Sequence, residues 1–143
     1  MPTVNPGVTA EWGAVLAHRP DDQRAAAELR FTESGLAPET VKAVLDDGGD
    51  ALYAAASSNQ DGWAVQFGGP LAVALLAAEI SALAAHLNSR ASAVRAAAVE
   101  ELLDEFSAVT VAARLGVSRQ KVYDICRGNL GADFIRQVPW RQP

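Results

Sequence analysis

Hydrogen-bonding side chains of several chemical kinds gather in one segment near the C-terminal end of the chain: Ser118, Arg119, Gln120, Lys121, Tyr123 and Arg127. A guanidinium group can donate two parallel hydrogen bonds to guanine, and a carboxamide can pair in the same way with adenine. We therefore expect Arg119, Gln120 and Tyr123 to meet base edges or nearby phosphates. Lys121 and Arg127 suit phosphate oxygens. These residue types favour contact with double-stranded DNA.

Apolar and small residues around this segment predict two short helices that would position the polar side chains. Ala112 is small enough to let the two helices touch, and Gly116 tolerates the positive φ of a sharp turn. Ser118 can cap the second helix and bond a phosphate, and Thr110 lies near the start of the first helix. The predicted motif core comprises Ala112, Leu115, Gly116, Val117, Val122 and Ile125, helped by Val111, Leu102, Leu103 and Phe106.

The run Ala-Ala-Arg-Leu-Gly-Val-Ser-Arg-Gln-Lys-Val-Tyr, residues 112–123, resembles the helix-turn-helix superfamily of bacterial and phage DNA-binding regulators. The resemblance covers this C-terminal motif alone and identifies no specific family. It implies a DNA-binding role for Ser118, Arg119, Gln120, Lys121, Tyr123 and Arg127. A helical segment used for packing or protein contact is the alternative. Asp124 would repel phosphate unless it pairs with Arg127 or Lys121.

Charge is distributed unevenly along the 143 residues, whose net charge is −5. Residues 1–105 carry six Lys and Arg against fifteen Asp and Glu, a net of −9. Residues 106–143 carry six against two, a net of +4. This asymmetry indicates a DNA-reading end and an acidic body that faces away from phosphate.

The composition and the positions of Pro and Gly predict an all-α fold. Alanine is abundant, and Pro and Gly separate the segments that have a helical pattern. We expect a small N-terminal helical domain over residues 1–69, a helix or linker over 70–92, and a trihelical helix-turn-helix domain over 93–143. Helices are predicted from Thr9 to Ala17, from Pro20 to Gly35, from Ala37 to Leu45 and, with Asp50 as a cap, from Ala51 to about Ala56. A short extended piece is predicted over Trp63–Phe67.

The stretch from Leu71 to Phe106 contains neither Pro nor Gly and predicts one long helix, or two with a break near Asn88 and Ser89. Its apolar residues with alternating spacings of three and four predict a pairing seam and homodimer interface formed by Val73, Leu76, Ile80, Leu83 and Leu87. Glu79 and His86 would be costly in a bilayer, so a membrane span is not expected. No signal peptide is expected, and the predicted location is cytoplasmic.

Other chemistry is weakly represented in the sequence. His18 and His86 have no partner carboxylate at ligand spacing, so a packing role is favoured over a metal site. Cys126 stands alone and suits either a small apolar filler or a redox sensor. The Asp-rich segment 46–50 favours a helix end over a calcium loop. No catalytic motif is present, so neither an enzyme nor a cofactor is expected.

These observations predict a sequence-specific DNA-binding protein, a transcriptional regulator that acts as a homodimer. A protein–protein interaction module, antitoxin-like or a phage assembly factor, is one alternative, and a DNA-architecture protein without sequence preference is another. The N-terminal aromatic residues suit a helical core or an effector pocket: Trp12, Phe31, Tyr53, Trp63 and Phe67. A protein partner or a small-molecule effector at the N-terminal domain therefore stays open.

Overall fold

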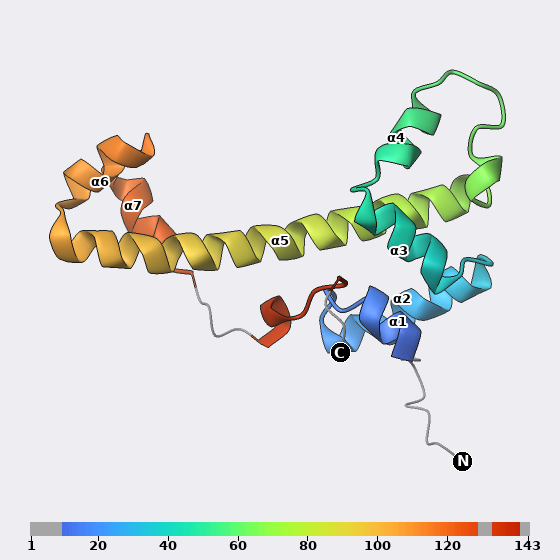
Figure 1. Cartoon of the computed structure of the whole chain (residues 1–143), viewed down its shortest axis with the longest axis horizontal. Coiled ribbons are helices and arrows are strands. Elements are labelled where there is room, and N and C mark those ends of the chain that lie inside the picture. Colours follow the sequence, from blue (N-terminus) through green and yellow to red (C-terminus); the bar gives the residue numbers. More distant parts are fainter. Residues whose placement is uncertain (1–9, 129–132, 141–143) are drawn as a thin grey trace, which may run out of the picture. The chain divides into compact units, whose positions relative to one another are not determined.

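The computed structural model describes residues 10–128 and 133–140, and the regular structure in these ranges is entirely helical. The expected all-α class is confirmed for this part of the chain. The helices, labelled in Figure 1, are α1 (Ala10–Val15), α2 (Asp21–Glu33), α3 (Pro38–Asp46), α4 (Asp50–Ala56), α5 (Pro70–Glu105), α6 (Ala108–Leu115) and α7 (Arg119–Ile125), with short 3₁₀ turns η1 (Val65–Phe67) and η2 (Asp133–Arg136).

The chain divides into two compact units within α5. Unit 1 comprises residues 1–85 and 137–143, and unit 2 comprises residues 86–136. The first half of α5 therefore belongs to unit 1 and its second half to unit 2. No break occurs at Asn88 or Ser89, so the central segment is one helix rather than two.

Unit 1 has an apolar core contributed by α1 to α4 and the first half of α5. Trp12 of α1 stacks on Phe31 of α2, with ring centroids 5.5 Å apart and planes inclined by 6°. Leu16, Val41 and Leu76 are fully buried beside this pair. Two of the five N-terminal aromatics are thus core residues, whereas Tyr53 is exposed.

The predicted seam on α5 lies largely inside unit 1. Leu76 and Leu83 are buried in its core, and Val73 and Ile80 pack against that core. Leu87 is exposed. The first four side chains are covered by the chain's own helices, because the apolar stripe of α5 supplies the surface that the short helices need to bury. These four side chains are therefore not available for the predicted homodimer interface.

The segment before α5 differs from the prediction. Instead of an extended piece over Trp63–Phe67, successive turns lead into the 3₁₀ turn η1. Gly62 and Gly68 flank the segment with φ of 71° and 108°, which glycine adopts without strain. The Phe67 N–H donates to the Ala64 carbonyl at 3.1 Å, so the backbone bonds are local rather than cross-strand.

A buried ionic cluster joins α5 to the connection between α1 and α2. His18 Nε2 lies 2.5 Å from Glu79 Oε2, and Arg19 Nε and Nη2 each donate to Glu79 oxygens at 2.9 Å. No carboxylate stands at ligand spacing from His18 in the sequence, but folding brings Glu79 to it from 61 residues away, and His18 is buried there. Burial by itself raises the pKa of Glu79, but the hydrogen bonds from His18 and Arg19 outweigh it, and the net shift is downward.

Helix α5 is long and apolar enough to cross a membrane by length and composition alone. The core helix of a soluble protein passes the same test, so this finding is weak evidence of a span. Glu79 is the carboxylate in the apolar first half of α5, and it is hydrogen-bonded to His18 and Arg19 of the same chain.

Unit 2 has a smaller core formed by the second half of α5, α6 and α7. Val99 of α5, Val111 and Ala112 of α6, and Val122 and Ile125 of α7 are buried together. Leu103, Val117 and Cys126 pack against this cluster. Three helical segments thus bury one face each and leave their other faces exposed.

Candidate nucleic-acid interface

The start of α6 is fixed by a side-chain cap. Ser107 accepts a hydrogen bond from the Thr110 backbone N–H at 3.2 Å, and its own hydroxyl lies 3.0 Å from Thr110 Oγ1. A serine cap of this kind stabilises a helix by about 1 kcal/mol. Thr110 therefore lies in the first turn of α6, half-buried, and its hydroxyl oxygen accepts a hydrogen bond from the Ser107 hydroxyl.

The turn between α6 and α7 has the glycine geometry expected from the sequence. Gly116 adopts φ 70° and ψ 33°, the left-handed conformation. The Val117 N–H then donates to the Ala112 carbonyl at 3.0 Å, closing the end of α6. A residue with a Cβ would be strained at position 116, although the space beside it is open. Ala112 is buried where α6 packs, as a small residue at a helix contact should be.

The α7 helix is positioned by its own cap and by two buried side chains. Ser118 accepts from the Lys121 backbone N–H at 3.0 Å, as predicted for a capping serine. Val122 and Ile125 point into the unit 2 core. The remaining predicted contact residues of this segment lie together on its exposed side: Ser118, Arg119, Gln120, Lys121, Tyr123 and Arg127.

Asp124 lies on the same exposed segment, and its charge is partly matched there. Its Oδ1 is 3.6 Å from Arg127 Nη2, and Gln120 Nε2 donates to it at 3.3 Å. Of the two pairings considered for this carboxylate, the structure contains the one with Arg127. Arg119 and Lys121 form no ion pair among the described residues, so their charges are available to an anionic partner.

Three residues predicted to form or support the motif core are exposed rather than buried. Leu115 is 41% exposed, and Leu102 and Phe106 are each 36% exposed, so none of them belongs to the buried cluster. Leu115 is the last residue of α6, and the chain turns at Gly116 toward α7. The Leu115 side chain therefore lies at the end of the helix and stays exposed. Arg114 instead places its guanidinium 5.2 Å from the centre of the Phe106 ring.

The end of α7 packs against α5 through Gly128. A Cβ built at Gly128 would lie 2.8 Å from the Ser92 carbonyl oxygen and 2.8 Å from Ala96 Cβ. The sequence marks this glycine only as a helix end. Its close contact with the second half of α5 depends on which residues folding brings opposite it, and no local pattern reveals that.

The charge asymmetry is smaller when it is counted by folded unit. Unit 2 carries seven Lys and Arg against six Asp and Glu, a net of +1, and unit 1 has a net of −6. The difference arises because the acidic end of α5 belongs to unit 2: Glu100, Glu101, Asp104 and Glu105. These four carboxylates are exposed, so the surface of unit 2 carries negative as well as positive charge.

The other candidate groups give no second site in unit 2. Cys126 is a free thiol that is partly buried beside the core. No group of three or more His, Cys, Asp or Glu able to hold a metal ion occurs in the described ranges. No family model, curated protein or solved structure matches the chain.

Proposed function

We propose that this chain is a sequence-specific DNA-binding protein, a transcriptional regulator whose α6 and α7 act as a helix-turn-helix. The observation that carries the proposal is the pair of short capped helices joined through left-handed Gly116. One face of α7 is buried by Val122 and Ile125, and its other face offers Arg119, Gln120 and Lys121. A helix held in this way presents donors to a major groove without further ordering.

The proposed roles differ along α7. Arg119 and Gln120, next to the capping Ser118, read base edges, because the N-terminal residues of a recognition helix enter the groove. Lys121, Tyr123 and Arg127 contact phosphates or neighbouring edges. The basic side chains supply affinity, and the bidentate groups supply sequence preference.

A homodimer fits this function, because one seven-residue recognition helix offers few contacts and paired half-sites double them. Because four of the five seam residues are buried in the unit 1 core or packed against it, the proposed homodimer would use another surface. We therefore propose two chains for each bound duplex. A DNA-architecture protein without sequence preference would bind without a defined half-site spacing.

The test is fluorescence anisotropy with a random duplex pool and with duplexes enriched from it, at low and physiological salt. Arg119→Ala is expected to weaken binding to enriched duplexes by about 1–3 kcal/mol and to relax the preferred base at one position. Lys121→Ala is expected to weaken binding to all duplexes alike. It should also reduce the slope of log affinity against log salt concentration by about one. Sedimentation of the complex should give two chains for each enriched duplex.

Arg30→Ala is the matched control, since Arg30 is an exposed arginine on α2 in unit 1. It should leave affinity and sequence preference unchanged. Equal affinity for random and enriched duplexes would favour a DNA-architecture protein. Absence of binding at low salt by the folded protein would refute DNA binding and direct the search to protein partners.

A further inference from the structure

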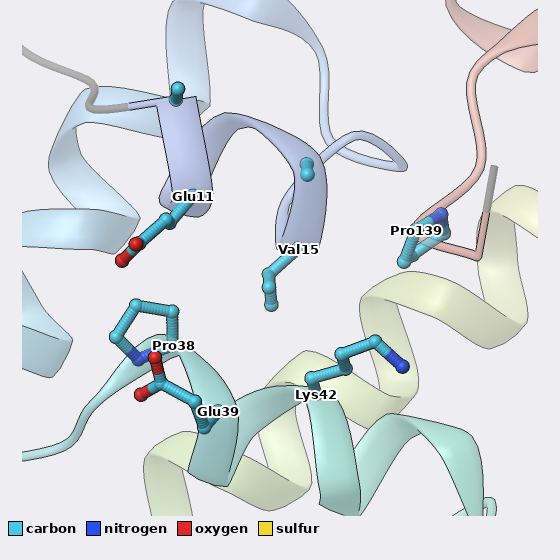
Figure 2. Close-up of a pocket in the computed structure, with 8 residues that line it drawn as sticks. Glu11, Val15, Pro38, Glu39, Lys42 and Pro139 are labelled. Atoms are coloured by element: carbon cyan, nitrogen blue, oxygen red, sulfur yellow. The ribbon is translucent and has the colours of Figure 1, made fainter. Parts of the chain in front are cut away.

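A cavity of about 370 Å³ lies in unit 1, at a distance in sequence from the segment proposed to bind DNA. It is lined by α1, α3 and the C-terminal segment through Ala10, Glu11, Ala14, Val15, Pro38, Glu39, Lys42 and Pro139 (Figure 2). This volume falls at the lower end of the range typical for small-molecule sites. None of the five N-terminal aromatic residues lines it, so it is not the aromatic pocket considered from the sequence.

The floor and walls of the cavity are mainly apolar. Val15 points into the space between α1 and α3, and the rings of Pro38 and Pro139 bound it on two sides (Figure 2). Ala10 and Ala14 leave room because their side chains are small. Such a surface favours the ring or hydrocarbon part of a ligand, which gains free energy by leaving water.

Two carboxylates lie on one side of this apolar space. Glu11 extends from α1 and Glu39 from the first turn of α3, and Figure 2 shows both on the same side of the cavity. Within the described ranges neither carboxylate takes part in a hydrogen bond or ion pair. Their acceptor oxygens are therefore available to a bound group.

The one basic residue of the lining does not neutralise the two carboxylates. Lys42 extends toward the opposite side of the cavity (Figure 2), and its Nζ lies 2.6 Å from Asp46 Oδ2. The charge of Lys42 is thus matched within α3. The lining is mainly apolar, and the charges of Glu11 and Glu39 are not matched within it.

We infer that this cavity binds a small organic cation, an amine or quaternary ammonium group attached to an apolar ring or chain. The ammonium lies between Glu11 and Glu39, and the apolar part lies over Val15, Pro38 and Pro139. An organic anion would meet uncompensated carboxylates, and a bare metal ion would leave the apolar surface uncovered. This inference goes beyond the DNA-binding proposal and does not depend on it.

The experiment compares three ligands of one shape by isothermal titration on the full chain without DNA: naphthylmethylammonium, naphthylmethanol and naphthoate. The cation should bind most tightly, the alcohol more weakly, and the carboxylate least. Glu11→Gln and Glu39→Gln should each lower the affinity for the cation by about two- to fivefold, as expected for a partly exposed ion pair. Both should leave the affinity for the alcohol unchanged. Amide chemical-shift changes should concentrate in α1, α3 and residues 137–140.

Glu33→Gln is the matched control, because it removes one exposed carboxylate from α2 outside the cavity. It separates a local contact from attraction to a protein of net charge −5. Equal affinities for cation and alcohol, equal losses for Glu33→Gln and Glu39→Gln, or no binding of any ligand would overturn the inference. Because DNA is absent from the titration, a failed DNA-binding test leaves this result unaffected.

Discussion

At the scale of single residues, Gly128 leaves far less room for a side chain than Gly116, the other glycine described in unit 2. Gly128→Ala would bring a Cβ to 2.8 Å from the Ser92 carbonyl oxygen, a backbone atom that cannot rotate away. The end of α7 must then move off α5, and overpacking of this kind costs about 1–3 kcal/mol. We expect faster amide hydrogen exchange in α6 and α7 and unchanged exchange in α2 and α3.

Exchange is the right measurement because Trp12, Trp63 and Trp140 all belong to unit 1, so tryptophan fluorescence does not report on unit 2. Arg127→Ala is a suitable control, since the neighbouring Arg127 side chain is 79% exposed. Unaltered exchange in the Gly128→Ala protein would show that α7 and α5 do not pack as closely as the structure has them.

At the scale of elements, α5 is bonded to the α1–α2 connection through Glu79. The pKa of Glu79 is lowered in the folded protein, so the unfolded chain takes up the proton first. The stabilisation is therefore complete above the ordinary pKa of a glutamate and is lost as the pH falls through it toward the lower folded value. Glu79→Gln should reduce the free energy of unfolding by about 3–5 kcal/mol at neutral pH, because it leaves Arg19 uncompensated.

Urea unfolding followed by tryptophan fluorescence between neutral pH and about pH 3 measures this dependence. The wild-type stability should fall more steeply on acidification than that of Glu79→Gln. Glu101→Gln, at an exposed position of the same helix, should retain the wild-type profile. Parallel profiles for the wild type and Glu79→Gln would disprove the role of this carboxylate.

At the scale of the whole molecule, the acidic end of α5 belongs to the unit that we propose to bind DNA. Glu100→Gln combined with Glu101→Gln would raise the net charge of unit 2 from +1 to +3. Weaker repulsion of phosphate should increase DNA affinity about two- to tenfold at low salt, and screening should remove most of the gain at high salt. Anisotropy titrations at several salt concentrations measure the effect.

The same charge change in unit 1, Asp21→Asn with Asp22→Asn, is the comparison for this test. It should alter DNA affinity less, because those carboxylates belong to the other folded unit. If the Glu100 and Glu101 double variant bound DNA with unchanged affinity at low salt, the acidic end of α5 would have no effect on DNA binding.

Local sequence determined the helices of this protein and the geometry of the α6–α7 turn. Ser107 and Ser118 cap their helices as such residues do anywhere, and Gly116 takes the left-handed conformation because only glycine does so without strain. These features involve contacts a few residues apart, so their signals are complete within a short window. The helical class and the exposed α7 residues could be predicted for the same reason.

Tertiary structure alone decided which distant residues meet. Glu79 joins His18 across 61 residues, Gly128 lies against Ser92, and Glu11 faces the same cavity as Glu39. The apolar stripe of α5 predicted a buried face but not its partner, because burial against the chain's own helices and burial against a second copy require the same pattern. The spacing of apolar residues specifies which face of a helix must be buried, and only the tertiary structure specifies what covers that face.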